Sequence, residues 1–143
     1  MTKKMWKNQI DYVIDIVERF FNYEVIIDTD EEDRVDFCEK KIYINSRSHP
    51  ETRFYTLLHE YGHVEIHEAE WASLAEGIPA YRKFRNTRSG RSHSGKISTI
   101  AEEIESWKRG RLLALHECLY VNDKKYEKHM NEALMSYIRW AAE

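Results

Sequence analysis

The chain has few cysteines and no long apolar segment. Its 143 residues include two cysteines, Cys38 and Cys118, and neither belongs to a Cys-x-x-Cys pair of the kind that binds zinc or exchanges disulfides. A disulfide scaffold is therefore excluded, and we expect both thiols to be reduced. No apolar run approaches the roughly 18 residues of a membrane-spanning helix, and the start of the chain lacks the apolar core of a signal peptide. We expect a cytoplasmic protein that does not enter a membrane.

An excess of charge of one sign is also missing. The formal net charge is −3 at pH 7, which argues against general binding to nucleic acid. One stretch differs, because no acidic residue lies between Glu76 and Glu102. It contains the basic residues Arg82, Lys83, Arg85, Arg88, Arg91 and Lys96. Interleaved Ser, Gly and Asn residues predict a flexible loop over residues 82–98, which could close as a lid or, through residues 82–96, bind nucleic acid or an acidic partner.

The spacing of apolar residues predicts a single α+β domain over residues 1–143. Apolar residues that recur every three or four positions indicate amphipathic helices, whereas strict alternation indicates strands. The expected helices are residues 4–21, a helix that begins near residue 49, a helix from about 97 to 120 and a C-terminal helix capped by Asp123. The expected strands are residues 23–27, 35–38 and 41–44, which form a small three-stranded antiparallel sheet. If the edge of this sheet borders an active-site cleft, an extended peptide could pair with it.

The segment His59-Glu60-Tyr61-Gly62-His63 carries the most specific chemical signal of the chain. Residues four apart lie on one face of an α-helix, so His59 and His63 can hold one metal ion while Glu60 reaches a water molecule beside it. Imidazole nitrogens at this spacing are typical zinc ligands. The motif therefore predicts half of a hydrolytic zinc site.

The residues around the motif favour a helix. Ser48 and Glu51 match a capping box that would start this helix. Gly62 lies between the two histidines, and a glycine inside a helix costs about 1 kcal/mol relative to alanine. Such a glycine indicates that another element packs closely against the metal-binding face.

A hydrolytic zinc site needs a third protein ligand and one open position. We expect this ligand on the next helix, where the apolar residues of segment 97–107 place Glu103 on the buried face and Glu102 and Glu105 further round. A buried carboxylate is costly unless it is paired, and a metal ion offsets that cost. Glu103 is therefore the predicted third ligand, with Glu102 and His67 as alternatives.

The segments Lys41–Asn45 and His59–His67 together resemble the ImmA/IrrE-type metallopeptidases, a gluzincin-like family with an HExxH motif. Segment 103–107 is similar to the second motif of that family, a glutamate ligand on the following helix. The resemblance implies a zincin-like fold, a Zn²⁺ cofactor and a narrow protein substrate, and small stand-alone phage-encoded members are the most similar in kind. One departure is Trp107, since such enzymes usually carry Asp or Asn four residues after the ligand Glu103, where it orients a metal-binding histidine.

The predicted function is zinc-dependent hydrolysis of a peptide bond, with Glu60 as the general base that takes a proton from water activated by the metal. An electrophilic helper is expected among Tyr55, Tyr61, His67 and His93. Two alternatives stay open at this point. The chain could be a zinc-containing, non-catalytic binding module that takes a protein or nucleic-acid partner through its basic loop, or it could be a zinc hydrolase that acts on a bond other than a peptide bond.

Overall fold

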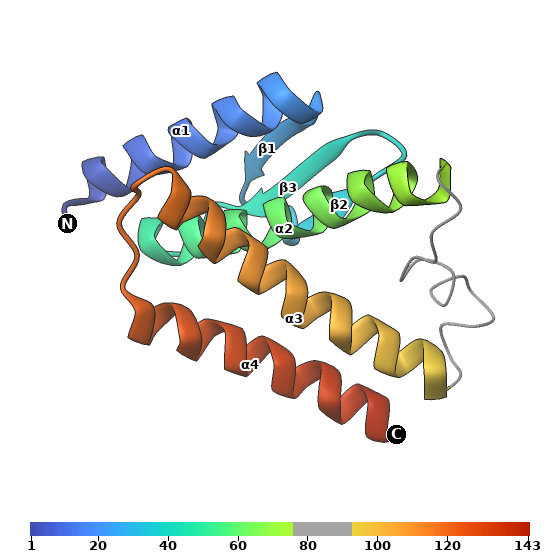
Figure 1. Ribbon diagram of the computed structural model, residues 1–143. Helices are drawn as coiled ribbons and strands as arrows, with labels where there is room; N and C mark the ends of the chain where they lie inside the picture. The colour runs from blue at the N-terminus through green and yellow to red at the C-terminus, as the bar shows by residue number, and fades with distance from the viewer. Residues whose placement is uncertain (76–92) are drawn as a thin grey trace.

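The computed structural model describes the backbone of residues 1–75 and 93–143 and the side chains of residues 1–69 and 95–143. The elements are α1 (Lys3–Phe21), β1 (Glu24–Asp28), β2 (Arg34–Asp36), β3 (Lys41–Asn45), α2 (Pro50–Ala75), α3 (His93–His116) and α4 (Asp123–Ala142). The protein is a small α+β domain, as the apolar spacing predicts. In Figure 1, α3 crosses α2, and α4 runs antiparallel to α3 on the side away from the sheet.

The sheet is mixed, so the prediction of a purely antiparallel sheet was wrong. Its strand order is β1-β3-β2, with β1 parallel to β3 and β2 antiparallel to β3. The central position of β3 follows from its composition, because Ile42 and Ile44 are 0% and 1% exposed and a central strand buries such residues best. The turn that precedes β2 is fixed by Asp33, whose carboxylate accepts a hydrogen bond from the amide of Asn45 at 2.7 Å. This arrangement leaves β2 as an edge strand.

Helix α1 is an amphipathic packing helix, close to the predicted range of residues 4–21. Its buried residues are Trp6, Ile10, Val13 and Val17. Thr2 caps its N-terminus by accepting a hydrogen bond from the amide of Met5, and Asn22 ends it in the left-handed conformation, with φ of 59°. The helix thereby covers α2 and one end of the sheet.

The start of α2 differs from the predicted capping box. His49, rather than Ser48, accepts the hydrogen bond from the amide of Glu51, through its Nδ1 at 3.1 Å. The carboxylate of Glu51 instead accepts hydrogen bonds from Tyr55 at 2.6 Å and from Lys125 at 3.2 Å. The side chain of Glu51 therefore ties α2 to the first turn of α4, a tertiary contact that outcompetes the local one.

Two glycines allow α2 and α3 to cross at very short distance. A Cβ atom on Gly62 would lie 2.0 Å from the carbonyl oxygen of Ser106, and one on Gly110 would lie 2.3 Å from that of Leu58. The close packing expected from Gly62 is thus confirmed. Backbone contact at this crossing brings the side chains of residues 102–107 directly onto the motif face of α2.

The predicted loop at residues 82–98 divides into two parts. Residues 93–98 belong to the first turns of α3, because the helix begins at His93. Residues 82–92, with most of the basic positions proposed to bind nucleic acid or an acidic partner, lie outside the described residues. The cap of α4 also differs from the prediction, since Asn122 accepts the capping bond from the amide of Lys125 while Asp123 pairs with Arg111 at 2.6 Å.

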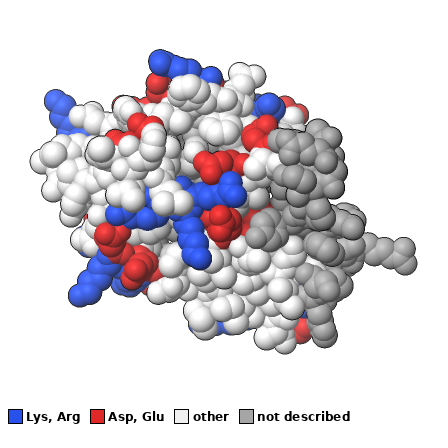
Figure 2. All heavy atoms as spheres, viewed as in Figure 1, with Lys and Arg blue, Asp and Glu red and all other residues white. Residues whose placement is uncertain are grey.

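Charges of both signs are interleaved on the face seen in Figure 2. Arg109 of α3 lies 3.1 Å from Glu65 of α2 and 3.1 Å from Glu105 one turn earlier on its own helix. The first pair joins the two helices, and the second lies within α3. Among the helices of the described residues, none combines the length and the apolar character that crossing a membrane requires.

Candidate metal centre and cleft

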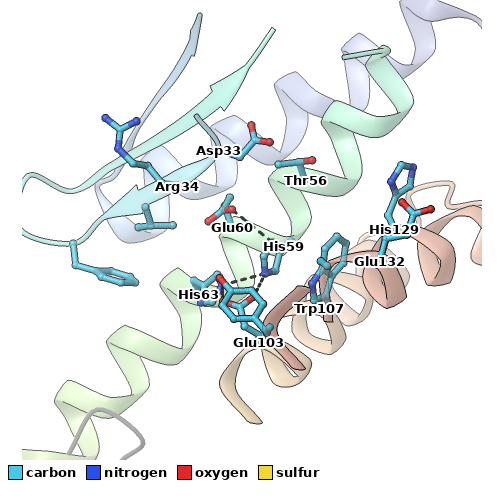
Figure 3. A pocket seen from close by; sticks show the side chains of 14 residues that line it. Asp33, Arg34, Thr56, His59, Glu60, His63, Glu103, Trp107, His129 and Glu132 are labelled. Atoms are coloured by element: carbon cyan, nitrogen blue, oxygen red, sulfur yellow. Dashed lines mark hydrogen bonds and ion pairs between the residues drawn. The ribbon is translucent and has the colours of Figure 1, made fainter. Parts of the chain in front are cut away.

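The two histidines of the motif and Glu103 converge on one point between α2 and α3 (Figure 3). Nε2 of His59 lies 2.8 Å from one oxygen of Glu103, and Nε2 of His63 lies 3.0 Å from the other. The two Nε2 atoms are 3.1 Å apart. Helix α2 supplies the histidines from consecutive turns, and the close crossing at Gly62 brings α3 near enough for Glu103 to reach both.

This donor set fits a zinc ion. Four ligands at about 2.0–2.1 Å from a tetrahedral zinc are separated from one another by about 3.3 Å. The three separations of 2.8, 3.0 and 3.1 Å are slightly shorter, so a small outward movement of each side chain would accommodate the ion. Two imidazoles and one carboxylate also form the donor set of catalytic rather than structural zinc sites. The geometry supports His59, His63 and Glu103 as the ligand set.

Glu60 lies next to these three residues and points into the same cleft (Figure 3). The nearest nitrogen and oxygen atoms of His59, Glu60 and His63 lie within 4.8 Å of one another. The oxygens of Glu103 are closer still to the two Nε2 atoms, at 2.8 and 3.0 Å. Glu60 is 5% exposed and lies 3.6 Å from Nδ1 of His59, beyond hydrogen-bond distance. Burial raises the pKa of the Glu60 carboxyl above its usual range, despite the opposing effect of the two histidines. Such a group is poised to accept and release a proton.

Glu102 occupies a position that the sequence interpretation did not give it. Its carboxylate oxygen lies 3.1 Å from Nδ1 of His63, and the residue is 2% exposed. The expectation that only Glu103 faces inward on this turn was wrong. The buried face was located from the positions of the apolar residues, and this criterion misses a carboxylate that is buried against a histidine. Glu102 lies on the far edge of the His63 ring from Glu103, and it can therefore hold the ring but not share the same nitrogen.

Trp107 stacks on the ring of His59. The ring centroids are 4.3 Å apart and the planes are inclined by 7°. The indole is 4% exposed and also meets Tyr126 edge to face, with centroids 5.3 Å apart. Trp107 thus restrains the orientation of His59 by packing, at the position where a hydrogen-bonding Asp or Asn was expected.

The metal-free site is electrostatically coupled. Burial lowers the pKa of His63, but its hydrogen bonds with Glu102 and Glu103 outweigh this effect and raise the pKa to about 10. Burial raises the pKa of Glu103, but hydrogen bonds from His59 and His63 lower it well below its usual range. These shifts favour a histidinium beside the carboxylates of Glu102 and Glu103, and a metal cation that displaces the proton would supply positive charge at the same place.

The candidate electrophilic helpers differ in where they lie. Tyr55 is fully buried and bonded to Glu51 and to the amide of Asn122, and Tyr61 bonds to Glu65, so both hydroxyls are already engaged. The ring of His67, also an alternative third ligand, stacks on Phe37 with centroids 4.2 Å apart. His93 is the first residue of α3, and its side chain lies outside the described residues.

The candidate metal centre opens into a cleft of about 570 Å³. One wall is formed by residues of β2 and its flanking turns, including Asp33, Val35 and Phe37, and the opposite wall by residues of α4. The lining residues from α4 include His129, Glu132 and Tyr137, which the sequence analysis did not assign to the site. Together with Ala133, the residues His129 and Tyr137 recur every four positions along one side of α4, a signal that could have grouped them. Only the packing of α4 against α3 shows that this side faces the motif.

Comparison with protein families gives one match. The family model of Peptidase_M78, described as the IrrE N-terminal-like domain, matches residues 15–89. This segment contains the complete HExxH motif and the sheet before it, and it ends before Glu102 and Glu103. Neither the curated proteins nor the solved structures include a significant match to the chain. The match covers more than half of the 143 residues, and the chain therefore belongs to this metallopeptidase-type family, as its resemblance to ImmA/IrrE-type enzymes indicates.

Proposed function

We propose that this protein is a zinc-dependent peptidase that cleaves a narrow range of protein substrates. The observation that carries the proposal is the convergence of His59, His63 and Glu103 at mutual distances of 2.8–3.1 Å, with the buried carboxylate of Glu60 beside them. Membership of a peptidase family supports the same reaction class. Helix α2 supplies two ligands and the base, α3 supplies the third ligand, and β2 and α4 supply the walls of the cleft, which supports a catalytic site rather than a chance cluster.

The residues divide the work in a simple way. Zinc, when bound, supplies a Lewis acid that polarises a carbonyl and acidifies water. His59, His63 and Glu103 hold it, and Glu60 takes a proton from the attacking water and returns it to the leaving nitrogen. The raised pKa of Glu60 supports this role, since a carboxylate with a raised pKa is a stronger base towards water.

The open edge of the sheet supports a peptide as the substrate. Strand β2 pairs with β3 on one side, and its residues line the cleft on the other. An extended chain that adds to this edge would receive backbone hydrogen bonds and would lie across the metal centre. A small non-peptide ester has no backbone amides that could pair with such an edge. For this reason we favour peptide hydrolysis over hydrolysis of another bond.

Glu60→Gln provides the test. The amide keeps the size of the side chain but cannot take the proton, so cleavage of a proteome-derived peptide mixture should fall by at least about a hundredfold. Zinc content, measured by mass spectrometry, should stay at the parent level. The matched control is Glu127→Gln, an exposed glutamate of α4 outside the cleft. A Glu60→Gln protein that cleaves the mixture as fast as the parent would remove Glu60 from the mechanism.

A non-catalytic binding module is the second candidate, and one observation favours it. The proposed ligands come from two helices, so the ion would also tie α2 to α3 and could serve stability alone. Chelation separates the two functions. A structural zinc predicts cooperative unfolding when EDTA is added, whereas a catalytic zinc on this packed crossing predicts loss of cleavage with the far-UV circular dichroism largely retained.

A further inference from the structure

The cleft has chemically different ends along the edge strand. Successive side chains of a strand point to opposite faces, so Asp33, Val35 and Phe37 share one side of β2 and its flanking turns. All three line the cleft. Along this side the character of the wall changes from a carboxylate through a small aliphatic group to an aromatic ring.

The first end is acidic. The carboxylate of Asp33 is held by the amide of Asn45 at 2.7 Å, and Figure 3 shows it beside Thr56, one turn before Glu60 on α2. Across the cleft, His129 and Glu132 project from α4. The basic side chain of this wall, Arg34, is engaged elsewhere, because it bonds to Glu31 at 2.8 Å and its guanidinium lies 3.9 Å from the centroid of the Tyr43 ring. Within the part of the chain that the structure describes, Arg34 therefore does not neutralise Asp33 or Glu132, and both carboxylates can attract a cationic side chain.

The second end is apolar. Phe37 stacks on His67, which follows His63 by one turn of α2, so this end lies beyond the second histidine of the motif. Val35 lies between Phe37 and Asp33 along β2. The residues of the proposed metal centre therefore lie between the two ends. Glu60, 5% exposed and with a carboxylate oxygen 3.6 Å from Nδ1 of His59, faces the cleft in this middle part.

We propose that the cleft selects an extended peptide with a lysine or arginine side chain at the Asp33–Glu132 end and an apolar side chain at the Val35–Phe37 end. This inference rests on the proposed function, since it names the substrate class of the same site. Strand pairing is more stable in the antiparallel sense, and β2 runs from Arg34 to Asp36. An antiparallel peptide thus places its basic residue on the carboxyl side of the bond to be cleaved and its apolar residue on the amino side.

Binding to the full chain tests the proposal without requiring cleavage. The probe is a positional library of short fluorescein-labelled peptides in which one position at a time is fixed as lysine, norleucine or glutamate. Fluorescence anisotropy with zinc-loaded Glu60→Gln protein should give tighter binding for lysine than for norleucine at one position, and the reverse at a position towards the amino terminus. Each exposed carboxylate should contribute about two- to fivefold to the lysine preference.

Two variants assign this preference to named residues. Asp33→Asn keeps an oxygen that can accept the hydrogen bond from Asn45, and Glu132→Gln keeps the size of the side chain. Each variant should reduce the ratio of lysine affinity to norleucine affinity. The double variant should bring this ratio close to one. Glu127→Gln, on the same helix but outside the cleft, should leave the ratio unchanged. Equal affinity for lysine, norleucine and glutamate at every position, or the absence of any binding, would overturn the inference.

Parallel digestion by the parent protein keeps the two proposals distinguishable. Selective binding without any cleavage by the parent protein would contradict the proposed peptidase activity. It would still support the proposed selectivity of the two ends of the cleft. Cleavage that Glu60→Gln abolishes, at bonds with no basic residue after them, would support the peptidase and contradict the proposed selectivity.

Discussion

Glu102 and His63 are joined across the crossing of α2 and α3, with a carboxylate oxygen 3.1 Å from Nδ1 of the imidazole. The other nitrogen of this ring, Nε2, faces Glu103 at 3.0 Å. A carboxylate that accepts a hydrogen bond from Nδ1 fixes the tautomer in which Nε2 carries a lone pair, and it makes that nitrogen a stronger donor to a metal. Adjacent residues of α3 therefore have different proposed tasks, because Glu103 faces the proposed metal position and Glu102 orients His63, one of the proposed ligands.

This relationship predicts a graded loss of zinc affinity. Glu102→Gln keeps a hydrogen-bond acceptor but loses the charge, and it should weaken zinc binding by about tenfold, whereas Glu102→Ala should weaken it by up to about a hundredfold. Competition with a chromophoric chelator measures both. Glu105→Gln, on the same helix but paired with Arg109, is the matched control and should bind zinc as the parent does. Parent-like affinity in the alanine variant would mean that His63 is oriented by its packing alone.

A second prediction concerns the stacking of Trp107 on His59, with centroids 4.3 Å apart. Trp107→Phe preserves a flat ring at this position, whereas Trp107→Leu keeps much of the apolar volume without a ring. We expect the leucine variant to bind zinc about three- to tenfold more weakly than the phenylalanine variant, since an aromatic pair contributes beyond its buried area. Thermal unfolding of both metal-free variants shows whether a difference in zinc affinity merely follows a difference in stability. Equal zinc affinities would assign Trp107 to the core alone.

A structural feature is predicted well from the sequence when the interactions that produce it are local along the chain. The α1 helix and the helix that carries the HExxH motif are set by periodicity within one helix, and local spacing predicts both well. The order β1-β3-β2 depends on which strand is buried in the centre, and the hydrogen bond between Glu102 and His63 depends on how closely two helices approach. Such features arise from packing between elements. The spacing of apolar residues does not represent this packing, because it treats every carboxylate as exposed to solvent.

The third prediction tests that close approach. Gly62→Ala places a Cβ atom 2.0 Å from the carbonyl oxygen of Ser106, so the two helices must separate. Alanine favours a helix by about 1 kcal/mol relative to glycine, but overpacking at a rigid crossing costs about 1–3 kcal/mol or more. We therefore expect a lower free energy of unfolding in urea and weaker zinc binding, because Glu103 moves away with α3. Ser136→Ala, at an exposed position of α4, is the control for helix propensity. A Gly62→Ala protein more stable than the parent would contradict the crossing.

The fourth prediction concerns the effect of pH on zinc binding. In the metal-free protein, burial lowers the pKa of His63, but hydrogen bonds with Glu102 and Glu103 raise it from 6.5 to about 10. The ring must lose this proton before Nε2 can bind a metal, so zinc affinity should still rise by up to about tenfold per pH unit between pH 7 and 8.5. A histidine with an ordinary pKa would give a plateau there. Calorimetry in buffers of different ionisation enthalpy counts the released protons, and about one per zinc at pH 8 is expected.

The same raised pKa predicts how the stability of the metal-free protein depends on pH. A group whose folded-state pKa exceeds its unfolded value binds its proton more tightly when folded, so it stabilises the fold fully below pH 6.5, and this contribution is lost as pH rises towards about 10. Urea unfolding of the chelator-treated protein should therefore show a falling free energy of unfolding across this window. Glu102→Gln weakens the hydrogen bond that holds the proton and should flatten the decline. A free energy of unfolding that is constant from pH 6.5 to 10, together with no proton release on zinc binding, would show that His63 is neutral before the metal arrives.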